Sequence, residues 1–414
     1  MSKTIIIIGA GLAGLSAALQ AAENGCNVKL VSSLPSERAQ SVMAEGGINA
    51  ALNTKDENDS PEEHFTDTIK AACGLADPNA VWGMTQAAPE LVHWLLKLGV
   101  KFNMSGYDDV DLRNFGGQKK KRTAFAQSDT GKQIMTAMID AVRRKEASGM
   151  VERFSHHSFL TLRLCGNICC GCVIRDEYSQ ETVELPGDAV IVATGGMHGL
   201  FGNTTGSLSN TGEVTAELFR LGVPLANGEM IQYHPTTVKC GGKRMLISEA
   251  ARGEGGRLFA MKDGKQWYFM EEKYPELGNL MPRDITAREI WKVSHESEVF
   301  LDMTEISEEI ISNKLSGLAD DCMTYLHKDI RKEPVSVLPG IHYFMGGILV
   351  DEQHRTPIQN LYAAGECCAQ YHGANRLGGN SLLGALYGGR VAAKSACEQA
   401  DVVDLSCATQ IDFP

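Results

Sequence analysis

The sequence predicts an α/β fold in which a Rossmann-like nucleotide-binding domain is built from both ends of the chain and interrupted by an inserted α+β domain. Residues 4–31 have the strand–helix–strand pattern of a β-α-β unit, with a GxGxxG turn before the helix. A further strand ending in glycines lies at residues 189–196, and another begins at Asn360, after a long stretch without a parallel β-α rhythm. We therefore expect a first nucleotide-binding part (1–229), an inserted domain (230–341) and a second nucleotide-binding part (342–414).

The first β-α-β unit opens the chain. Thr4 to Ile8 is a continuous run of mostly β-branched residues, which predicts a buried strand, and residues 27–31 form the second strand. The turn glycines allow a tight bend and bring backbone N–H groups close to a pyrophosphate at the start of the helix. These glycines are Gly9, Gly11 and Gly14. Ser32 stands where an acidic residue usually binds a ribose, so ribose recognition differs from the plain NAD pattern or comes from another segment.

The remaining elements follow from periodicity and from turn residues. Residues 39–51 are small and contain glycine, which suits backbone lying against a flat ligand ring. In the insertion, glycine turns, mixed strands and polar helices follow one another. Helices are expected at residues 61–73, 79–98, 132–145 and 381–399, a β-rich piece at 151–185, and the final strand of the first sheet at 360–366.

Composition excludes several classes of function. The 414 residues are 43% hydrophobic and 22% charged, which is typical of a globular protein. The net charge of −12 argues against an extended nucleic-acid surface, since phosphate binding needs clustered Lys and Arg. Residues 5–19 are apolar but too short to span a bilayer, and no small-residue cleavage site follows the start of the chain. We expect a cytoplasmic protein with no direct membrane insertion, twelve reduced cysteines and no metal site.

A candidate for ionic chemistry lies in the segment SEAARGEGG, which begins at Ser248. Glu249 and Arg252 are three residues apart, so one helical turn puts both side chains on the same face. A carboxylate and a guanidinium so placed can hold each other or pass a proton along. Most Glu/Arg pairs at this spacing are solvated surface pairs. This pair becomes a candidate for chemistry because nucleotide-binding patterns lie before and after it in the chain.

A family resemblance extends over nearly the whole chain. The matching stretches, in chain order, are GAGLAG, AEGGINAAL, NFGGQ, SDTG, ATGG, QYHPT, SEAARGEGG, MPRD, HYFMGGI, LYAAGE and HGANRLGGNSL. Together they resemble the flavoprotein of the fumarate reductase and succinate dehydrogenase family, with L-aspartate oxidases as near relatives. The resemblance implies an FAD-binding domain and a mobile capping domain, with a dicarboxylate between them.

The resemblance also implies which residues bind the substrate. Arg376 and His342 are expected to clamp its carboxylates, and His234 and Ser248 to complete the pocket. A C4 dianion needs several fixed donors or cations, and an arginine offers a bidentate fork to a carboxylate. Aspartate oxidases have a glutamate, able to recognise an amino group, where this chain has Phe115, so Phe115 argues against an amino acid substrate.

Proton delivery is expected from Arg283, with Glu249 and Arg252 relaying the proton from solvent. The residues that hold both substrate carboxylates polarise the double bond of the substrate. Hydride from N5 of reduced flavin then reaches one carbon, and a proton must reach the other. An arginine ordinarily has a pKa above 12 and can act as an acid only if it is reprotonated at once. This requirement is the physical reason for a carboxylate and a second arginine behind it.

The expected cofactor contacts come from the glycine turns and the segments that match the family. They are Gly9, Gly11, Gly14, Ser32, Ala44, Gly46, Gly47, Ala193, Gly195, Glu213, Gly365, Glu366, Ser381 and Leu382. Membrane-bound members attach FAD through a histidine just before the AEGG segment, and here that place is taken by Gln40. We therefore expect noncovalent FAD, which favours fumarate reduction over succinate oxidation because a histidyl bond raises the flavin potential.

The sequence thus predicts an FAD-dependent fumarate reductase, or a close 2-enoate reductase, supplied with electrons by a separate protein or reduced cofactor. The chain has no haem-attachment motif and no second nucleotide fingerprint that would supply electrons internally. L-Aspartate oxidase is the first alternative. A flavin-binding protein without turnover is the second, and the presence of Arg283, His342 and Arg376 argues against it.

Overall fold

The computed structural model describes residues 2–107 and 109–401. Its centre is a five-stranded parallel sheet of strand order β20-β10-β1-β2-β6. The strands are β1 (Thr4–Ile8), β2 (Asn27–Ser32), β6 (Val151–Ser155), β10 (Ala189–Val192) and β20 (Leu361–Ala363). Strands from both ends of the chain therefore lie in one sheet, which confirms the predicted α/β fold.

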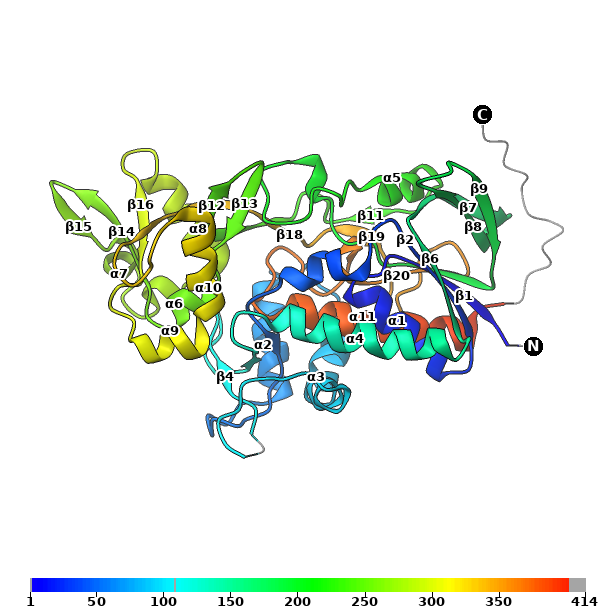
Figure 1. Cartoon of the computed structure of the whole chain (residues 1–414), viewed down its shortest axis with the longest axis horizontal. Helices are drawn as coiled ribbons and strands as arrows, with labels where there is room; N and C mark the ends of the chain where they lie inside the picture. Colours follow the sequence, from blue (N-terminus) through cyan, green and yellow to red (C-terminus); the bar gives the residue numbers. More distant parts are fainter. Residues whose placement is uncertain (1, 108, 402–414) are drawn as a thin grey trace.

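The run of isoleucines in β1 is explained by burial on both faces of this sheet. Ile5 and Ile7 belong to a core shared with three helices, whereas Ile6 and Ile8 point into a second core on the opposite face. The helices are α1 (Leu12–Glu23), α4 (Thr130–Ala147) and α11 (Asn380–Gln399), with α2 (Pro61–Ala71) and α3 (Pro78–Leu98) outside them. Figure 1 shows α1, α4 and α11 side by side under the sheet.

The opposite face is covered by an antiparallel sheet of order β7-β8-β9. It consists of β7 (His157–Cys165), β8 (Ile168–Asp176) and β9 (Thr182–Pro186). Its thiols are mostly buried, and the described free cysteines include Cys169, Cys170 and Cys172. Cys165 is disulfide-bonded, so the expectation of a reduced thiol was wrong at this position.

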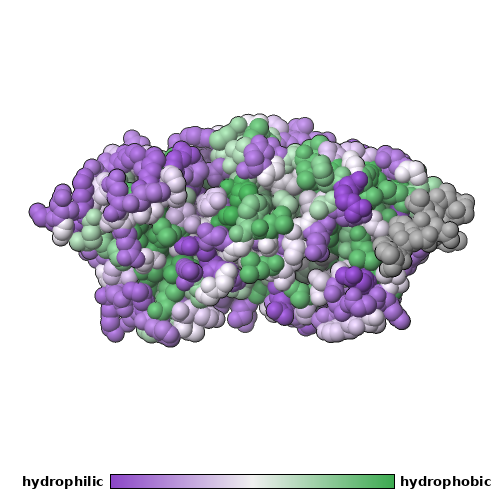
Figure 2. Space-filling view, turned by 90° about the horizontal axis from the view of Figure 1, so that it is seen from above, coloured by the Kyte–Doolittle hydropathy of each residue, from purple (hydrophilic) through white to green (hydrophobic). Residues whose placement is uncertain are grey.

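The insertion has a hydrophobic core of its own, centred on a sheet of order β15-β14-β16-β17. Its strands are β14 (Arg257–Lys262), β15 (Lys265–Trp267), β16 (Val299–Asp302) and β17 (Val335–Ser336). Its helices include α6 (Glu249–Gly253), α7 (Phe269–Lys273), α8 (Arg283–Val293), α9 (Glu308–Lys314) and α10 (Ser316–Asp321). It forms the body at the left of Figure 1, and its upper surface in Figure 2 is mainly hydrophilic.

A further sheet, of order β13-β12-β18, connects the insertion to the nucleotide-binding part. It consists of β12 (Ile231–Cys240), β13 (Lys243–Leu246) and β18 (Leu338–Phe344). The expected division after residue 341 falls inside β18, because β18 pairs with β12 on both sides of this position, from Leu338 to Phe344, with a register shift at Gln232/Tyr233. The division of the chain into three parts stays a prediction. No helix in the described ranges is long and apolar enough to cross a bilayer.

Candidate active site

A cavity of about 830 Å³ runs from the ends of the parallel strands to the β12–β18 sheet and the insertion. Most residues predicted to bind the cofactor line it: Gly9, Gly11, Ser32, Ala44, Gly46, Gly47, Ala193, Gly195, Glu213, Gly365, Glu366, Ser381 and Leu382. Most residues predicted to act on the substrate line it as well: Phe115, His234, Ser248, Glu249, Arg283, His342 and Arg376. Two predicted residues, Gly14 and Arg252, do not line the cavity.

The glycine turn fits a dinucleotide because glycine at two positions lets the backbones of β1, α1 and β10 pack closely together. Gly9 has a φ of 111°, and a Cβ there would come within 2.2 Å of the Ala193 carbonyl oxygen. A Cβ on Gly14 would come within 1.9 Å of the Gly9 carbonyl oxygen, so Gly14 permits close packing rather than contact with a ligand. The start of α1 therefore lies against the cavity, where its backbone N–H groups favour a pyrophosphate.

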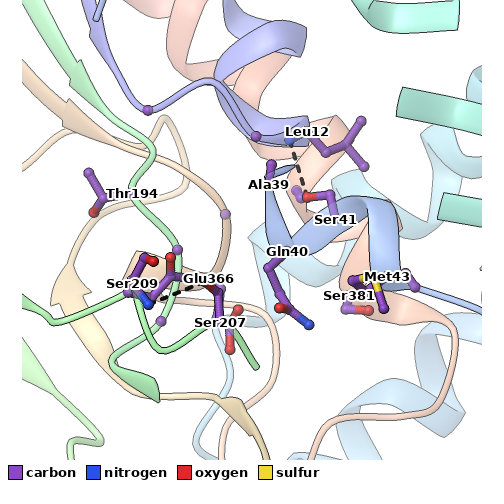
Figure 3. Close-up of a pocket in the computed structure, with 18 of the residues that line it drawn as sticks. Leu12, Ala39, Gln40, Ser41, Met43, Thr194, Ser207, Ser209, Glu366 and Ser381 are labelled. Atoms are coloured by element: carbon purple, nitrogen blue, oxygen red, sulfur yellow. Dashed lines mark hydrogen bonds between the residues drawn. The ribbon is translucent and has the colours of Figure 1, made fainter. Parts of the chain in front are cut away.

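The short 3-10 helix η2 (Gln40–Met43) borders the same cavity next to the start of α11. Figure 3 shows Gln40, Met43 and Ser381 around this part of the cavity, and the Ser41 hydroxyl accepting a hydrogen bond from the Leu12 N–H at 3.2 Å. Gln40 stands at the position where the resemblance placed a flavin-linking histidine. Its amide offers hydrogen bonds but no nucleophilic ring nitrogen.

The end of the cavity beside Ser32 contains other polar groups that could recognise a ribose. This end is lined by Ser32, Ser158, Arg175 and Glu177, and Ser158 donates to Glu177 through its hydroxyl. The hydroxyl of Ser32 and the Nε of Arg175 are buried without a hydrogen-bond partner among the described residues. These polar groups fit a ribose and a base, although no sequence pattern predicted that β7 and β8 would contribute them.

At the other end, Glu249 holds two arginines. One Glu249 oxygen lies 2.8 Å from Nε and 2.6 Å from a terminal nitrogen of Arg283. The second oxygen accepts from the Gly116 N–H at 2.8 Å and lies 3.4 Å from Arg252, as the spacing of three on α6 predicted. Burial alone would raise the pKa of Glu249, but the charges of Arg283 and Arg252 outweigh it and hold that pKa below its ordinary value.

Arg376 is buried, and the part of the chain that the structure describes provides no carboxylate in an ion pair with it. It is 3% exposed, donates to the side-chain oxygen of Gln232 at 2.9 Å, and lies over the Tyr343 ring at 4.5 Å. Its Nε has no hydrogen-bond partner within the described residues. Burial, and after it the like charge of Arg283, lowers the pKa of Arg376 to about 9. This arrangement leaves positive charge that only an anion can compensate.

Two histidines face each other beside these arginines. The ring centroids of His234 and His342 are 5.0 Å apart. Burial, followed by the charge of Arg283, lowers the pKa of each ring well below its ordinary value, so both are neutral near pH 7. Nε2 of His234 is buried and has no partner in the part of the chain that the structure describes. The two rings therefore offer hydrogen bonds rather than charge to a ligand.

The remaining predicted residues shape the cavity. Ser248 caps α6, with its hydroxyl 3.4 Å from the Ala250 N–H. Phe115 is 2% exposed, and its ring fills the space that side chains on Gly46 and Gly378 would occupy. The described residues contain no group of three or more His, Cys, Asp or Glu side chains placed to hold a metal ion.

Sequence reasoning missed Gln232, which ties the two cavity arginines together. Its side-chain oxygen accepts from Arg376 at 2.9 Å and from Arg283 at 3.1 Å, and its amide nitrogen donates to the Arg376 carbonyl at 2.7 Å. Gln232 lies two residues before His234 on β12, and side chains two apart share one face of a strand. That spacing is the signal that could have identified it.

Comparisons with known proteins agree with this geometry. Residues 4–382 match the family model described as FAD binding domain. The chain is 44% identical to the succinate dehydrogenase flavoprotein subunit of Bacillus subtilis, over 98% of this chain and 70% of that protein. It is 34% identical to the L-aspartate oxidase of Streptomyces coelicolor, over 96% of this chain and 69% of that protein.

Among solved structures, the chain resembles the quinol fumarate reductase FrdA of E. coli with a TM-score of 0.91 and 30% identity. The match covers 98% of this chain and 72% of FrdA. The family model, the sequence relatives and the fold all indicate the same cofactor and the same class of chemistry. The chain therefore belongs to the FAD binding domain family, as an FAD-dependent oxidoreductase of the fumarate reductase and succinate dehydrogenase type that acts on CH–CH groups.

Proposed function

We propose that this protein reduces the double bond of fumarate, or of a closely related C4 dicarboxylate. The observation that carries the proposal is Arg376, a buried guanidinium in the cavity next to Arg283 that has no carboxylate partner among the described residues. A dianion in this place would satisfy both the charge and the orphaned Nε, because arginine binds carboxylates through paired N–H donors. Monoanionic or neutral substrates would leave part of this charge buried and uncompensated.

In the proposed mechanism, Arg376 and His342 bind the substrate carboxylates, and His234 and Ser248 complete the pocket. When bound, reduced FAD supplies the electron pair for one carbon of the double bond. Arg283 delivers a proton to the other carbon from a guanidinium held in place by Glu249 and Gln232. Once Arg283 has given up its proton, Glu249 takes a proton from Arg252, which lies 3.4 Å away, and passes it to Arg283, and Arg252 regains a proton from solvent.

The choice between fumarate reduction and aspartate oxidation depends on the groups that would meet an amino group. Phe115 offers an apolar ring, packed between Gly46 and Gly378, at the position where the resemblance places the glutamate of aspartate oxidases. An ammonium group against this ring would lose water without gaining a carboxylate. We therefore favour fumarate, and keep L-aspartate oxidase as the second candidate because one relative carries that name.

Anaerobic flavin spectroscopy tests this choice. The FAD-loaded protein, reduced chemically, should be reoxidised by fumarate at a rate of at least about 1 per second, as is typical of enzyme turnover. L-Aspartate added to the oxidised protein should leave the flavin absorbance unchanged, because Phe115 provides no partner for the amino group. The measurement is stopped-flow absorbance of the flavin.

Crotonate is the matched control ligand, because it has the same double bond but a single carboxylate. It should reoxidise the reduced flavin at least about 100-fold more slowly than fumarate, since it leaves one cavity cation unpaired. Bleaching by aspartate would mean an oxidase, and equal rates with crotonate would remove the case for a dicarboxylate site.

Gln40 leads to a prediction about the cofactor linkage. Precipitation of the FAD-loaded protein with acid should release all of the yellow colour into the supernatant, because an amide side chain forms no bond to the flavin ring. The measurement is the absorbance spectrum of supernatant and redissolved pellet. Yellow colour that stays on the polypeptide after washing in denaturant would show a covalent bond and overturn the assignment of Gln40.

We also propose that electrons come from a separate donor, a protein or a reduced cofactor. The relative from Bacillus subtilis is named as a flavoprotein subunit, which supports a protein partner. A cytoplasmic location stays a prediction.

A further inference from the structure

The loop at residues 203–206 lies along β18 next to His342, and its position is fixed by backbone hydrogen bonds. The Ile341 N–H donates to the Asn203 carbonyl at 3.1 Å, and the Thr205 N–H donates to the Ile341 carbonyl at 2.9 Å. Thr204 and Ile341 form a parallel β-bridge. Thr205 is 7% exposed and lines the cavity. Its side chain is therefore held at a fixed distance from the His342 ring.

The hydroxyl of Thr205 has two possible acceptors, and the distances distinguish them. Nδ1 of His342 lies 2.7 Å from the hydroxyl oxygen, whereas the Ile341 carbonyl oxygen lies 3.5 Å away. Hydroxyl hydrogen bonds normally span about 2.5 to 3.0 Å, so the second distance is too long for a good bond. The Ile341 carbonyl already has the Thr205 N–H at 2.9 Å and the Thr204 hydroxyl at 3.1 Å against its two lone pairs. The Thr205 hydrogen therefore points to His342.

A neutral imidazole has one N–H, and accepting a hydrogen bond at Nδ1 places that hydrogen on Nε2. The charged or titratable groups that face the His342 ring are Arg283, Arg376, His198 and His234, and none is an acid that would favour the charged ring. We propose that Thr205 is a positioning residue, which donates to Nδ1 of His342 and thereby holds the ring as the tautomer that presents an Nε2–H donor to the cavity.

The consequence for substrate binding rests on the proposed function, whereas the tautomer itself does not. A carboxylate accepts hydrogen bonds only, so it needs an N–H on the ring nitrogen that faces it. The other tautomer would present a lone pair to the anion. The free energy needed to convert the ring to the Nε2–H form would then reduce the affinity for the substrate. Thr205 thus prepares His342 before the substrate arrives.

The test uses the full chain, loaded with FAD and labelled with ¹⁵N in histidine only. Long-range ¹H–¹⁵N spectra distinguish the two tautomers, and the His342→Gln variant identifies the His342 signals. Wild type and Thr205→Ser should both show the Nε2–H tautomer, because serine keeps the hydroxyl. Thr205→Val removes the donor at nearly constant shape and should give a substantial population of the Nδ1–H tautomer.

Two controls separate positioning from general stability. Thr204→Val removes the neighbouring hydroxyl, which contacts His198 and the Ile341 carbonyl but not the His342 ring. It frees one lone pair of that carbonyl, but the carbonyl oxygen lies 3.5 Å from the Thr205 hydroxyl, too far for a good bond, so the His342 tautomer should not change. The His234 signals, from a ring 5.0 Å away, should be the same in all variants. FAD content and Tm are recorded for each variant to show that it is folded.

Binding of malonate, a dicarboxylate that cannot be reduced, is measured in parallel from the flavin absorbance. Thr205→Val should weaken it about five- to ten-fold, and Thr205→Ser less than two-fold. An Nδ1–H tautomer in wild type, or an unchanged Nε2–H tautomer in Thr205→Val, would overturn the proposal. If malonate fails to bind wild type, the proposed function is wrong while the tautomer result still decides the role of Thr205.

Discussion

Replacement of Arg283 by alanine should leave FAD bound and lower the rate of fumarate reduction by at least about 1000-fold, within the range for loss of a general acid. Arg283 is 6% exposed at the start of α8 and donates to Glu249 rather than to the glycine turn that is predicted to bind the cofactor. The fold should tolerate the change because Glu249 keeps the Gly116 N–H and Arg252 as partners. The measurement is single-turnover reoxidation of the reduced flavin by fumarate.

Arg288 provides the matched control on the same helix. Its side chain is 62% exposed, it lies 4.0 Å from a carboxylate oxygen of Asp284, and it does not line the cavity. Arg288→Ala should reduce fumarate at the wild-type rate. Turnover by Arg283→Ala within ten-fold of wild type would overturn the assignment of proton delivery. A loss of FAD would instead show that Arg283 supports the cofactor site.

The fold could be predicted largely from local patterns. The isoleucine run, the GxGxxG turn and the strand that begins near Asn360 define the central sheet without any tertiary information, because each signal is contained within a few residues. The boundary after residue 341 was placed on a change of pattern. It could not take account of the pairing between β12 and β18, which are about a hundred residues apart in the chain.

The site likewise combines contacts that local sequence spacing predicts with contacts that only the structure shows. Glu249 and Arg252 are close in sequence, and their contact was predicted from helical spacing. The contacts of Gln232 with Arg376 and of Thr205 with His342 join residues 144 and 137 positions apart. No local pattern encodes such a pair, and both are uncharged side chains whose role depends on the partner they meet. Sequence therefore indicates which charged groups are present, whereas the structure shows what orients them.

A second large effect concerns the stability that the ligand-free protein loses because the charge of Arg376 is buried. Replacement of Arg376 by methionine should raise the Tm of the ligand-free, FAD-loaded protein by about 2 to 4 °C at pH 7. The pKa of Arg376 is lowered to about 9 by burial, so the folded state holds this proton less tightly than the unfolded chain does. The charged side chain thus destabilises the fold by its full amount below about pH 9, and this cost decreases only as the pH rises above that value toward the ordinary pKa of an arginine. An apolar side chain of similar length avoids the cost.

The same change should weaken malonate binding at least about 100-fold, because the anion loses a bidentate, desolvated partner. Malonate should accordingly raise the Tm of wild type but not of Arg376→Met, which differential scanning calorimetry measures directly.

Arg122 is the contrasting control. It is fully buried like Arg376, but Asp59 and Asp67 lie 2.8 Å and 2.9 Å from it. Arg122→Met should lower the Tm, since it leaves two carboxylates without their cation. If both variants lower the Tm and Arg376→Met still binds malonate, Arg376 is an ordinary structural arginine. Opposite shifts in the two variants would instead mean that the protein gives up stability at Arg376 in order to bind a dianion.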